Sequence, residues 1–202
     1  GETLVTRMRG HTIEITDMSL PDVPWMDYAA EVGAGNDVVW DGAAASYAAR
    51  DVLGHFQRVR DYVLEREPGF PWAQDVVPTQ VNLDDNHCNA WYSNGTMAFL
   101  SADPNGGCEN FGRISDVVYH EYGHGLHDYL IVSGGFDGTV SEGSADYLSA
   151  TIWDDPYMAI GAYGPGSWIR ELDTDKAYPD DIVGEVHADG LIWGSAMWHL
   201  RE

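Results

Sequence analysis

The chain has 202 residues, 44% of them hydrophobic, which is enough for one large domain or a unit of two lobes with its own core. Asp and Glu number 33 against 10 Lys and Arg, and this formal charge of -23 argues against nucleic acid and anionic membranes as partners and suits calcium sites or salty surroundings. The most apolar stretch, 156–169, is interrupted by glycines and a proline, so we expect no transmembrane helix.

The first half of the chain is predicted to be rich in β-structure around one long helix. Alternating apolar residues predict a strand over 11–17, and prolines and glycines predict loops or short turns over 18–42. Over 43–67 the apolar residues recur at steps of three and four, which predicts a helix that Pro68 and Gly69 end. The turn-rich segment 71–112 predicts a small sheet.

Two cysteines lie within that small sheet. Cys88 and Cys108 are twenty positions apart in a segment rich in Asn, Gly and Ser, and we expect a disulfide between them; two unpaired thiols are the alternative. Closing a loop of this length stabilises a fold by about 3 kcal/mol in the chain-entropy description. A disulfide would indicate an oxidising compartment, so we expect a secreted or extracellular protein.

The second half is predicted to be helical, with helices over 113–131, from about 141 to 153, and from 187 onward. We therefore expect an α+β fold with a sheet-rich N-terminal lobe over 1–112 and a helical C-terminal lobe over 113–202. The chain starts at Gly1 with neither an initiator Met nor a signal-like segment, and 191–202 has the pattern of an unfinished helix. We expect a piece of a longer precursor, truncated at its C-terminus.

The motif HEYGH occupies 120–124, inside the first helix of that half. Positions four apart lie on one face of a helix, so His120 and His124 can each place one imidazole nitrogen on the same zinc ion. Glu121 lies at the edge of that face, where it can take a proton from water without binding the metal. The alternative is a pair of buried, hydrogen-bonded histidines with no metal.

The segment that follows decides the third ligand. The metzincin continuation needs a glycine and a histidine where this chain has His127 and Leu130, and His127 lies too far along the helix to share the ion. The sequence EGSAD at 142–146 offers Glu142 as the ligand and Asp146, one turn later, as acceptor for the outer N–H of a liganding histidine. Alternatively, Glu142 closes a capping box that starts at Thr139.

With this ligand set the chain resembles the thermolysin-like and fungalysin-like zinc peptidases, the gluzincins, which combine H-E-x-x-H with a glutamate in E-x-x-x-D. Three other stretches carry the resemblance: Asn-Ala-Trp-Tyr at 89–92, Asp-Val-Val-Tyr at 116–119, and the segment from 185 that contains Val-His-Ala-Asp-Gly-Leu-Ile. The match covers roughly 87–200. It implies a two-lobed zincin fold with the zinc cleft between a sheet-rich lobe and a helical lobe.

The resemblance also implies how a peptide substrate would bind. Asn89, Ala90 and Trp91 would belong to an edge strand that pairs with the substrate backbone. Val117 would line the pocket for the residue after the cut, which by resemblance would be bulky and apolar.

Further residues receive catalytic or metal-binding roles from the same resemblance. His187 would donate a hydrogen bond to the oxyanion of the tetrahedral intermediate, and Arg170 would hold the substrate carbonyl. The resemblance also implies a calcium set of three carboxylates: Asp116, Asp154 and Asp155.

The chain departs from the family pattern in two ways. The family tyrosine that stabilises the transition state should lie between His124 and Glu142, where Tyr129 is the only tyrosine and lies too close to His124. Family chains also continue well beyond the late histidine, whereas 15 residues follow His187 here. A missing C-terminal segment or a propeptide is therefore an expected partner, beside a peptide or protein substrate.

The sequence as a whole predicts a secreted zinc-dependent endopeptidase that hydrolyses peptide bonds by zinc-activated water, with Glu121 as general base. Two alternatives stay open: an extracellular domain of zincin fold that is catalytically inactive or cleaves amides outside proteins, and a calcium-stabilised structural domain in which the motif is accidental.

Overall fold

A computed structural model describes residues 2–7, 12–20, 25–30, 42, 44–85, 88–103 and 105–201, with the backbone alone for 2–7 and 25–30. The strands are β1 (Glu2–Arg7), β2 (Ile13–Asp17), β3 (Trp25–Ala30), β4 (Val77–Leu83), β5 (Ala90–Ser93), β6 (Thr96–Leu100), β7 (Tyr157–Met158) and β8 (Arg170–Glu171). The helices are α1 (Tyr47–Arg66), α2 (Ser115–Leu130), α3 (Gly138–Trp153) and α4 (Val186–Arg201), with short 3₁₀ turns at Trp72–Gln74 and Phe111–Arg113.

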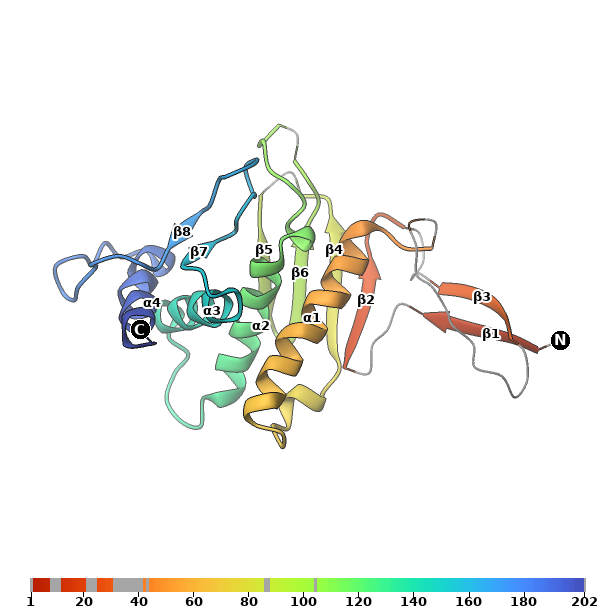
Figure 1. Cartoon of the computed structure of the whole chain (residues 1–202), viewed down its shortest axis with the longest axis horizontal. Helices are drawn as coiled ribbons and strands as arrows, with labels where there is room; N and C mark the ends of the chain where they lie inside the picture. The colour runs from red at the N-terminus through yellow and green to blue at the C-terminus, as the bar shows by residue number, and fades with distance from the viewer. Residues whose placement is uncertain are drawn as a thin grey trace.

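The central element is a four-stranded sheet in the order β2-β4-β6-β5. Strands β2, β4 and β6 are parallel, whereas β5 runs antiparallel to β6 and forms one edge. Helices α1 and α2 lie side by side across the same face of this sheet (Figure 1). The edge position of β5 leaves one side of that strand available for another extended chain.

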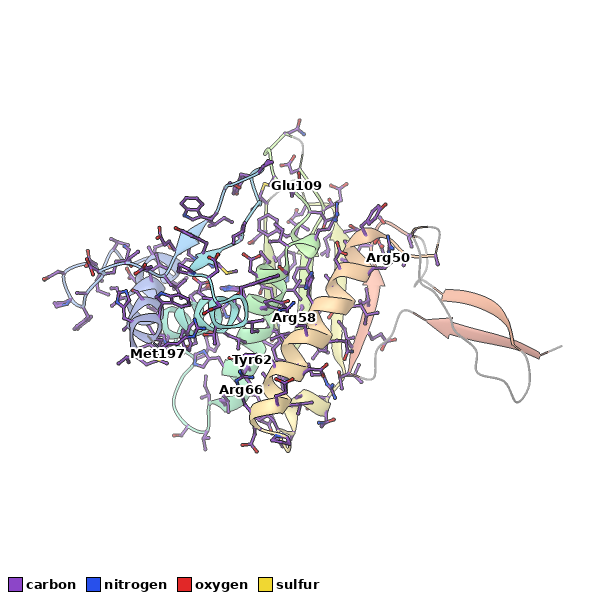
Figure 2. All side chains as sticks on the ribbon, in the orientation of Figure 1. Arg50, Arg58, Tyr62, Arg66, Glu109 and Met197 are labelled. Atoms are coloured by element: carbon purple, nitrogen blue, oxygen red, sulfur yellow. A yellow bond between two sulfur atoms is a disulfide. The ribbon has the colours of Figure 1, made fainter. Side chains whose placement is uncertain are left out.

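Helix α1 packs on the sheet through one apolar face. It begins after Ser46, whose side chain accepts a hydrogen bond from the Ala49 N–H and caps the helix. From Ala49 on, its buried residues recur at steps of three and four, and Ala48 is buried beside them: Ala48, Ala49, Val52, Phe56, Val59 and Val63. Arg50, Arg58, Tyr62 and Arg66, labelled in Figure 2, belong to the same helix and stay partly or fully exposed. The period of the apolar residues thus determines which face meets the sheet.

The helical half is a layered stack in which α3 contacts both α2 and α4. Glycines permit the close approach. A Cβ at Gly123 of α2 would lie 2.8 Å from the Ala145 Cα in α3, and one at Gly143 of α3 would lie 2.3 Å from the Gly190 carbonyl oxygen in α4. Contacts this short allow no side chain, so the three helices lie backbone against backbone around the candidate site.

Most of the elements predicted from the sequence are confirmed, with two corrections. The sheet over 71–112, the strand near 11–17 and helices α1, α2 and α4 occur within a few residues of the predicted bounds. Helix α3 begins at Gly138, and its N-cap is Asp137, so the capping box at Thr139 is wrong. The loop prediction for 18–42 is wrong at 25–30, where β3 pairs with β1; residues 21–24 and 31–41 lie outside the described part.

Two further predictions concern the chain as a whole. Within the described residues no helix is both long and apolar enough to cross a membrane. The mixed sheet with four helices agrees with the predicted α+β class, while the division into lobes at residue 112 stays a prediction.

Candidate metal centre

Helices α2 and α3 bring three ligand side chains to one point. His120 and His124, one turn apart on α2, direct their Nε2 atoms at Glu142, which α3 presents from its first turns. The His120 Nε2 lies 3.3 Å from Glu142 Oε2, and the His124 Nε2 lies 3.5 Å from Glu142 Oε1. One ligand atom from each of the three residues falls within 4.8 Å of the others.

The other ring nitrogen of each histidine lies close to an oxygen of α3. The His120 Nδ1 lies 2.7 Å from Asp146 Oδ1, the carboxylate that we proposed from the sequence behind a liganding histidine. The His124 Nδ1 lies 2.8 Å from the hydroxyl of buried Ser141, which sequence reasoning missed although it directly precedes Glu142. These contacts fix the ring orientations and leave both Nε2 atoms for a metal.

Asp146 is itself neutralised by an arginine. Two guanidinium nitrogens of Arg170 donate to it, Nε at 2.7 Å and Nη2 at 2.8 Å, in a bidentate pair. Burial opposes the charged carboxylate, but Arg170 and then His120 outweigh it and hold the pKa of Asp146 well below its usual value. Asp146 is therefore a charged acceptor behind His120.

The metal-free site has strongly shifted ring pKa values. Burial would lower the pKa of His120, but Asp146 and Glu142 outweigh it and raise the pKa to about 10. Burial and the neighbouring His120 charge lower the pKa of His124 to about 3. The carboxylates thus favour one positive charge on the His120 ring. The same negative groups would stabilise a divalent cation bound at Nε2 in place of that proton.

Glu121 lies beside the three ligands without belonging to them. Its side chain is buried, and its Oε2 makes no hydrogen bond within the described structure. Burial, with the nearby Glu142 carboxylate, raises the pKa of Glu121 to about 7, despite the opposing effect of His120. A carboxyl group with this pKa can both accept and return a proton near neutral pH.

The residues present fit a zinc ion. Two imidazole nitrogens and one carboxylate oxygen form a ligand set that leaves a fourth tetrahedral position open. Glu142 Oε2 is buried without a hydrogen bond, which is costly unless a cation occupies the site. The two Nε2 atoms and the Glu142 carboxylate converge on one point, as the ligands of a metal ion must.

A cavity of about 830 Å³ opens over these ligands. It is lined from β5, α2, α3, α4 and the segment around 158–170, and it contains every substrate-binding and catalytic residue predicted from the sequence: Asn89, Ala90, Trp91, Val117, Glu121, Arg170 and His187. Phe136, Tyr163 and Ile169 also line it, and no sequence pattern indicated them.

His187 faces the metal ligands from the start of α4. Its Nε2 lies 3.3 Å from Glu142 Oε1, and its Nδ1 lies 2.7 Å from Glu185 Oε1. Glu185 also accepts hydrogen bonds from the backbone N–H groups of His187 and Ala188. These bonds, with the bond to the His187 ring as the largest effect, lower the pKa of Glu185 to about 2. Glu185 therefore caps α4 and orients His187, a role that sequence reasoning missed.

The predicted calcium set is not assembled. Asp116 accepts the Ile160 N–H at 2.9 Å, and Asp155 accepts the Tyr157 N–H at 2.9 Å. Asp154 ends α3 and pairs instead with Arg201 at the end of α4. Within the described residues, His120, His124 and Glu142 form the one group of three or more such side chains close enough to share an ion.

Two aromatic or imidazole residues of α2 lie away from the ligands, as expected. Tyr129 packs edge-on against Phe70, and the His127 ring lies 5.5 Å from the ring of Phe136. Tyr129 therefore cannot serve the site, and Phe136 is the aromatic residue between His124 and Glu142 that lines the cleft.

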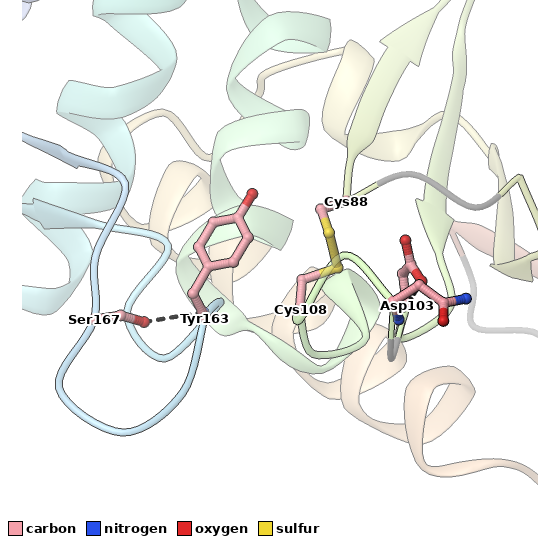
Figure 3. The surroundings of a disulfide bond; sticks show 6 residues. Cys88, Asp103, Cys108, Tyr163 and Ser167 are labelled. Carbon is pink, nitrogen blue, oxygen red and sulfur yellow. Dashed lines mark hydrogen bonds between the residues drawn. A yellow bond between two sulfur atoms is a disulfide. The ribbon is translucent and has the colours of Figure 1, made fainter.

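The disulfide is present, as predicted. Cys88 and Cys108 are joined, with their Cα atoms 5.9 Å apart (Figure 3). Cys88 directly precedes the cleft residue Asn89.

Comparison with known proteins shows a similarity of fold to one solved structure. The structure is similar to that of the precursor of protealysin, a metalloproteinase from Serratia proteamaculans, with a TM-score of 0.65 and 16% sequence identity over 95% of this chain and 70% of that one. No family model matches the sequence. No curated protein matches it either. The chain thus has the fold of a metalloproteinase precursor.

Proposed function

We propose that the chain is the catalytic part of a zinc-dependent endopeptidase that acts outside the cell. The observation that supports the proposal is the convergence of His120, His124 and Glu142 in a large cleft, beside a buried Glu121 carboxyl whose Oε2 makes no hydrogen bond in the described structure. A zinc ion bound there would supply Lewis-acid chemistry, polarising the scissile carbonyl and lowering the pKa of water.

Glu121 is the group that moves the proton. With a pKa near 7 before metal binding, it accepts a proton from the attacking water and returns it to the leaving amine. Its burial keeps bulk water from competing for that proton, and its position one residue after His120 keeps it beside the reacting atoms.

Two donors stabilise the charge that develops on the substrate carbonyl. His187 presents its Nε2 to the ligand cluster, while Glu185 holds the opposite ring nitrogen. Arg170 uses Nε and Nη2 to bind Asp146, so its Nη1 would hold the substrate carbonyl.

The substrate backbone would pair with β5 and add one strand to the sheet. Strand β5 is an edge of the sheet, and Asn89 and Ala90 line the cleft at its start. Val117 lies on the wall beside the ligands, where a bulky apolar residue after the cut would pack. The disulfide favours an oxidising, extracellular environment for this reaction.

The test is cleavage of a quenched peptide library by the zinc-loaded protein, beside the Glu121→Gln variant and the exposed control Glu65→Gln. We expect cleavage before bulky apolar residues, retention of zinc by all three proteins, and a loss of about 100- to 10,000-fold in kcat for Glu121→Gln alone. If the parent binds zinc at this site and cleaves no peptide, the chain is a binding domain or hydrolyses another amide, and the proposal fails.

A further inference from the structure

A second cavity of about 630 Å³ adjoins the metal cleft. Four residues line both hollows: Cys88, Asn89, Trp91 and Tyr163. The second cavity also contacts Leu100 and Asp85, and none of the metal ligands lines it. It therefore extends the cleft sideways along the start of β5, away from the reacting atoms.

Three separate segments line this cavity: the residues around Cys88, the end of β6 and the turn with Tyr163. The disulfide ties the first of them to the loop after β6. Cys88 precedes β5, and its partner Cys108 belongs to the loop that follows β6. The next residue in that loop, Glu109, donates its N–H to the Ala162 carbonyl at 2.8 Å. The loop after β6 thereby connects β5 covalently, and by a backbone hydrogen bond, to the turn that carries Tyr163.

The turn that carries Tyr163 is held by its own bonds. Ser167 Oγ accepts the Tyr163 N–H at 2.9 Å and donates to the Gly164 carbonyl at 2.8 Å. Figure 3 shows Tyr163 on this turn, beside the disulfide, with the bond to Ser167 drawn as a dashed line. The wall that Tyr163 contributes is thus positioned before any substrate arrives.

The alternation of side chains along β5 determines which substrate side chains face the second cavity. Tyr92 packs on α2, since a Cβ at Gly125 would lie 2.9 Å from its ring. Successive residues of a strand point to opposite faces, so Trp91 points away from α2. A peptide paired with β5 would alternate in the same way, and its side chains on the Trp91 face would enter the second cavity.

We infer that Cys88, Trp91 and Tyr163 form a second side-chain subsite of the cleft, which selects an aromatic side chain of the substrate. The indole of Trp91, the phenol ring of Tyr163 and the polarisable sulfur of Cys88, beside Leu100, offer apolar walls for another ring. The inference rests on the proposed function, because it assumes that a peptide pairs with β5.

Peptide binding to the zinc-loaded Glu121→Gln variant tests the subsite separately from catalysis. A labelled alanine-rich peptide carries one Phe, moved position by position, and fluorescence anisotropy gives each Kd. We expect the peptide with Phe at one position to bind about 10-fold more tightly than the others, because the ring is buried against Tyr163. Adding Tyr163→Ala should reduce that gain below about twofold, by the same burial argument.

Three further variants show which feature of the cavity matters. Tyr163→Phe should retain the gain because the ring is kept, and Tyr47→Ala, an exposed tyrosine on α1, should also retain it. The double variant Cys88→Ser, Cys108→Ser should lose the gain at the same peptide position, since the loop after β6 is then released.

The outcomes separate the two proposals. If no Phe position depends on Tyr163, the subsite is overturned, whether or not the parent cleaves peptides. If one position depends on Tyr163 but the parent cleaves no peptide, the subsite stands and the endopeptidase proposal fails. If no peptide binds at all, both are overturned.

Discussion

At the scale of single residues, the centre depends on which nitrogen of each histidine faces the cleft. Asp146 and Ser141 lie 2.7 and 2.8 Å from the Nδ1 atoms of His120 and His124. The two supports differ in kind, because Asp146 is a charged carboxylate paired with Arg170, whereas Ser141 is a neutral hydroxyl. Removing the hydroxyl therefore tests ring orientation without leaving a buried charge unpaired.

We predict that Ser141→Ala lowers zinc affinity by about 10- to 100-fold, because His124 loses the partner that orients its ring. Competition with a chromophoric chelator measures the affinity. Ser144→Ala on the same helix is the control, since its hydroxyl accepts the Trp193 indole N–H instead, and it should leave the affinity unchanged. Equal losses in both variants would mean that any damage to α3 weakens the site and that Ser141 has no specific role.

The buried carboxylate of Asp17, far from the cleft, gives a prediction on stability. Burial would raise its pKa, but bonds from Asn82, Ser19 and Ser46 outweigh this and lower it. A lowered folded-state pKa contributes stability that is present above the unfolded value of 3.8 and is lost as the pH falls through the folded value. We predict that Asp17→Asn costs about 1–3 kcal/mol at neutral pH.

The sign of this effect can be checked by urea unfolding of the parent and the Asp17→Asn variant between pH 7 and pH 3. The difference in their free energies of unfolding should shrink as the pH falls, because the parent loses the contribution and the variant never had it. A difference that grows toward acid pH would contradict the assignment.

The residues of the site differ in how far the sequence could predict them. His120, His124, Glu142 and Asp146 follow from helical spacing, since residues four apart must share a face. Ser141, Glu185 and Tyr163 depend on where a helix starts or how a turn closes, which no local pattern specifies. The structure does not bring the three predicted calcium carboxylates together, for a related reason: Asp154 lies at the left-handed end of α3, where Arg201 from α4 pairs with it.

At the scale of elements, the contact between α3 and α4 determines whether His187 reaches the ligands. Gly143 of α3 meets Gly190 and Gly194 of α4, and a Cβ at Gly143 would lie 2.3 Å and 2.9 Å from backbone atoms of those two residues. No rotamer can relieve an overlap with backbone, so a side chain at this position must move one helix away from the other.

We predict that Gly143→Ala destabilises the fold by about 1–3 kcal/mol or more, as expected for overpacking, and lowers kcat/KM further because His187 moves away from Glu142. The control is Gly54→Ala on α1, which has open space around it and should stabilise the protein by about 0.5–1 kcal/mol. Thermal unfolding and peptide kinetics measure both. Unchanged stability in Gly143→Ala would show that α3 and α4 are less closely packed than described.

Prediction of the elements from the sequence succeeded where periodicity is strong and failed where pairing is distant. The apolar steps of α1 predict its length and its buried face. Strand β3 was missed because Pro24 and Gly33 flank it like turn residues, and its pairing with β1 is a long-range contact. The start of α3 was placed three residues late, because Asp137 and not Thr139 caps the helix.

At the scale of the whole molecule, net charge determines how electrostatics affects stability. With 33 acidic against 10 basic residues, the chain repels itself at neutral pH. The described surface pairs, such as Arg113 with Asp51 and Arg60 with Asp61, are exposed and contribute at most about 1 kcal/mol each. Added salt should therefore weaken the repulsion between acidic residues more than it weakens the attraction within ion pairs.

We predict that raising NaCl from about 10 mM to about 150 mM raises Tm by several degrees, since the Debye length falls from about 30 Å to about 8 Å. Differential scanning calorimetry measures the shift, and sucrose at equal osmolality serves as the uncharged control. A Tm that falls with salt would mean that ion pairs outweigh the net repulsion.

The proposed hydrolysis requires a zinc ion with one position open for water, so the decisive measurement is of its coordination shell. His187 Nε2 is as close to Glu142 as the two ligand histidines are, so a fourth protein ligand is the rival arrangement. X-ray absorption spectra of the zinc-loaded protein and of its His187→Ala variant distinguish the two. We predict two histidine nitrogens, one carboxylate and one water oxygen in both. Three histidine nitrogens in the parent and two in the variant would make the zinc structural and contradict the proposed hydrolysis.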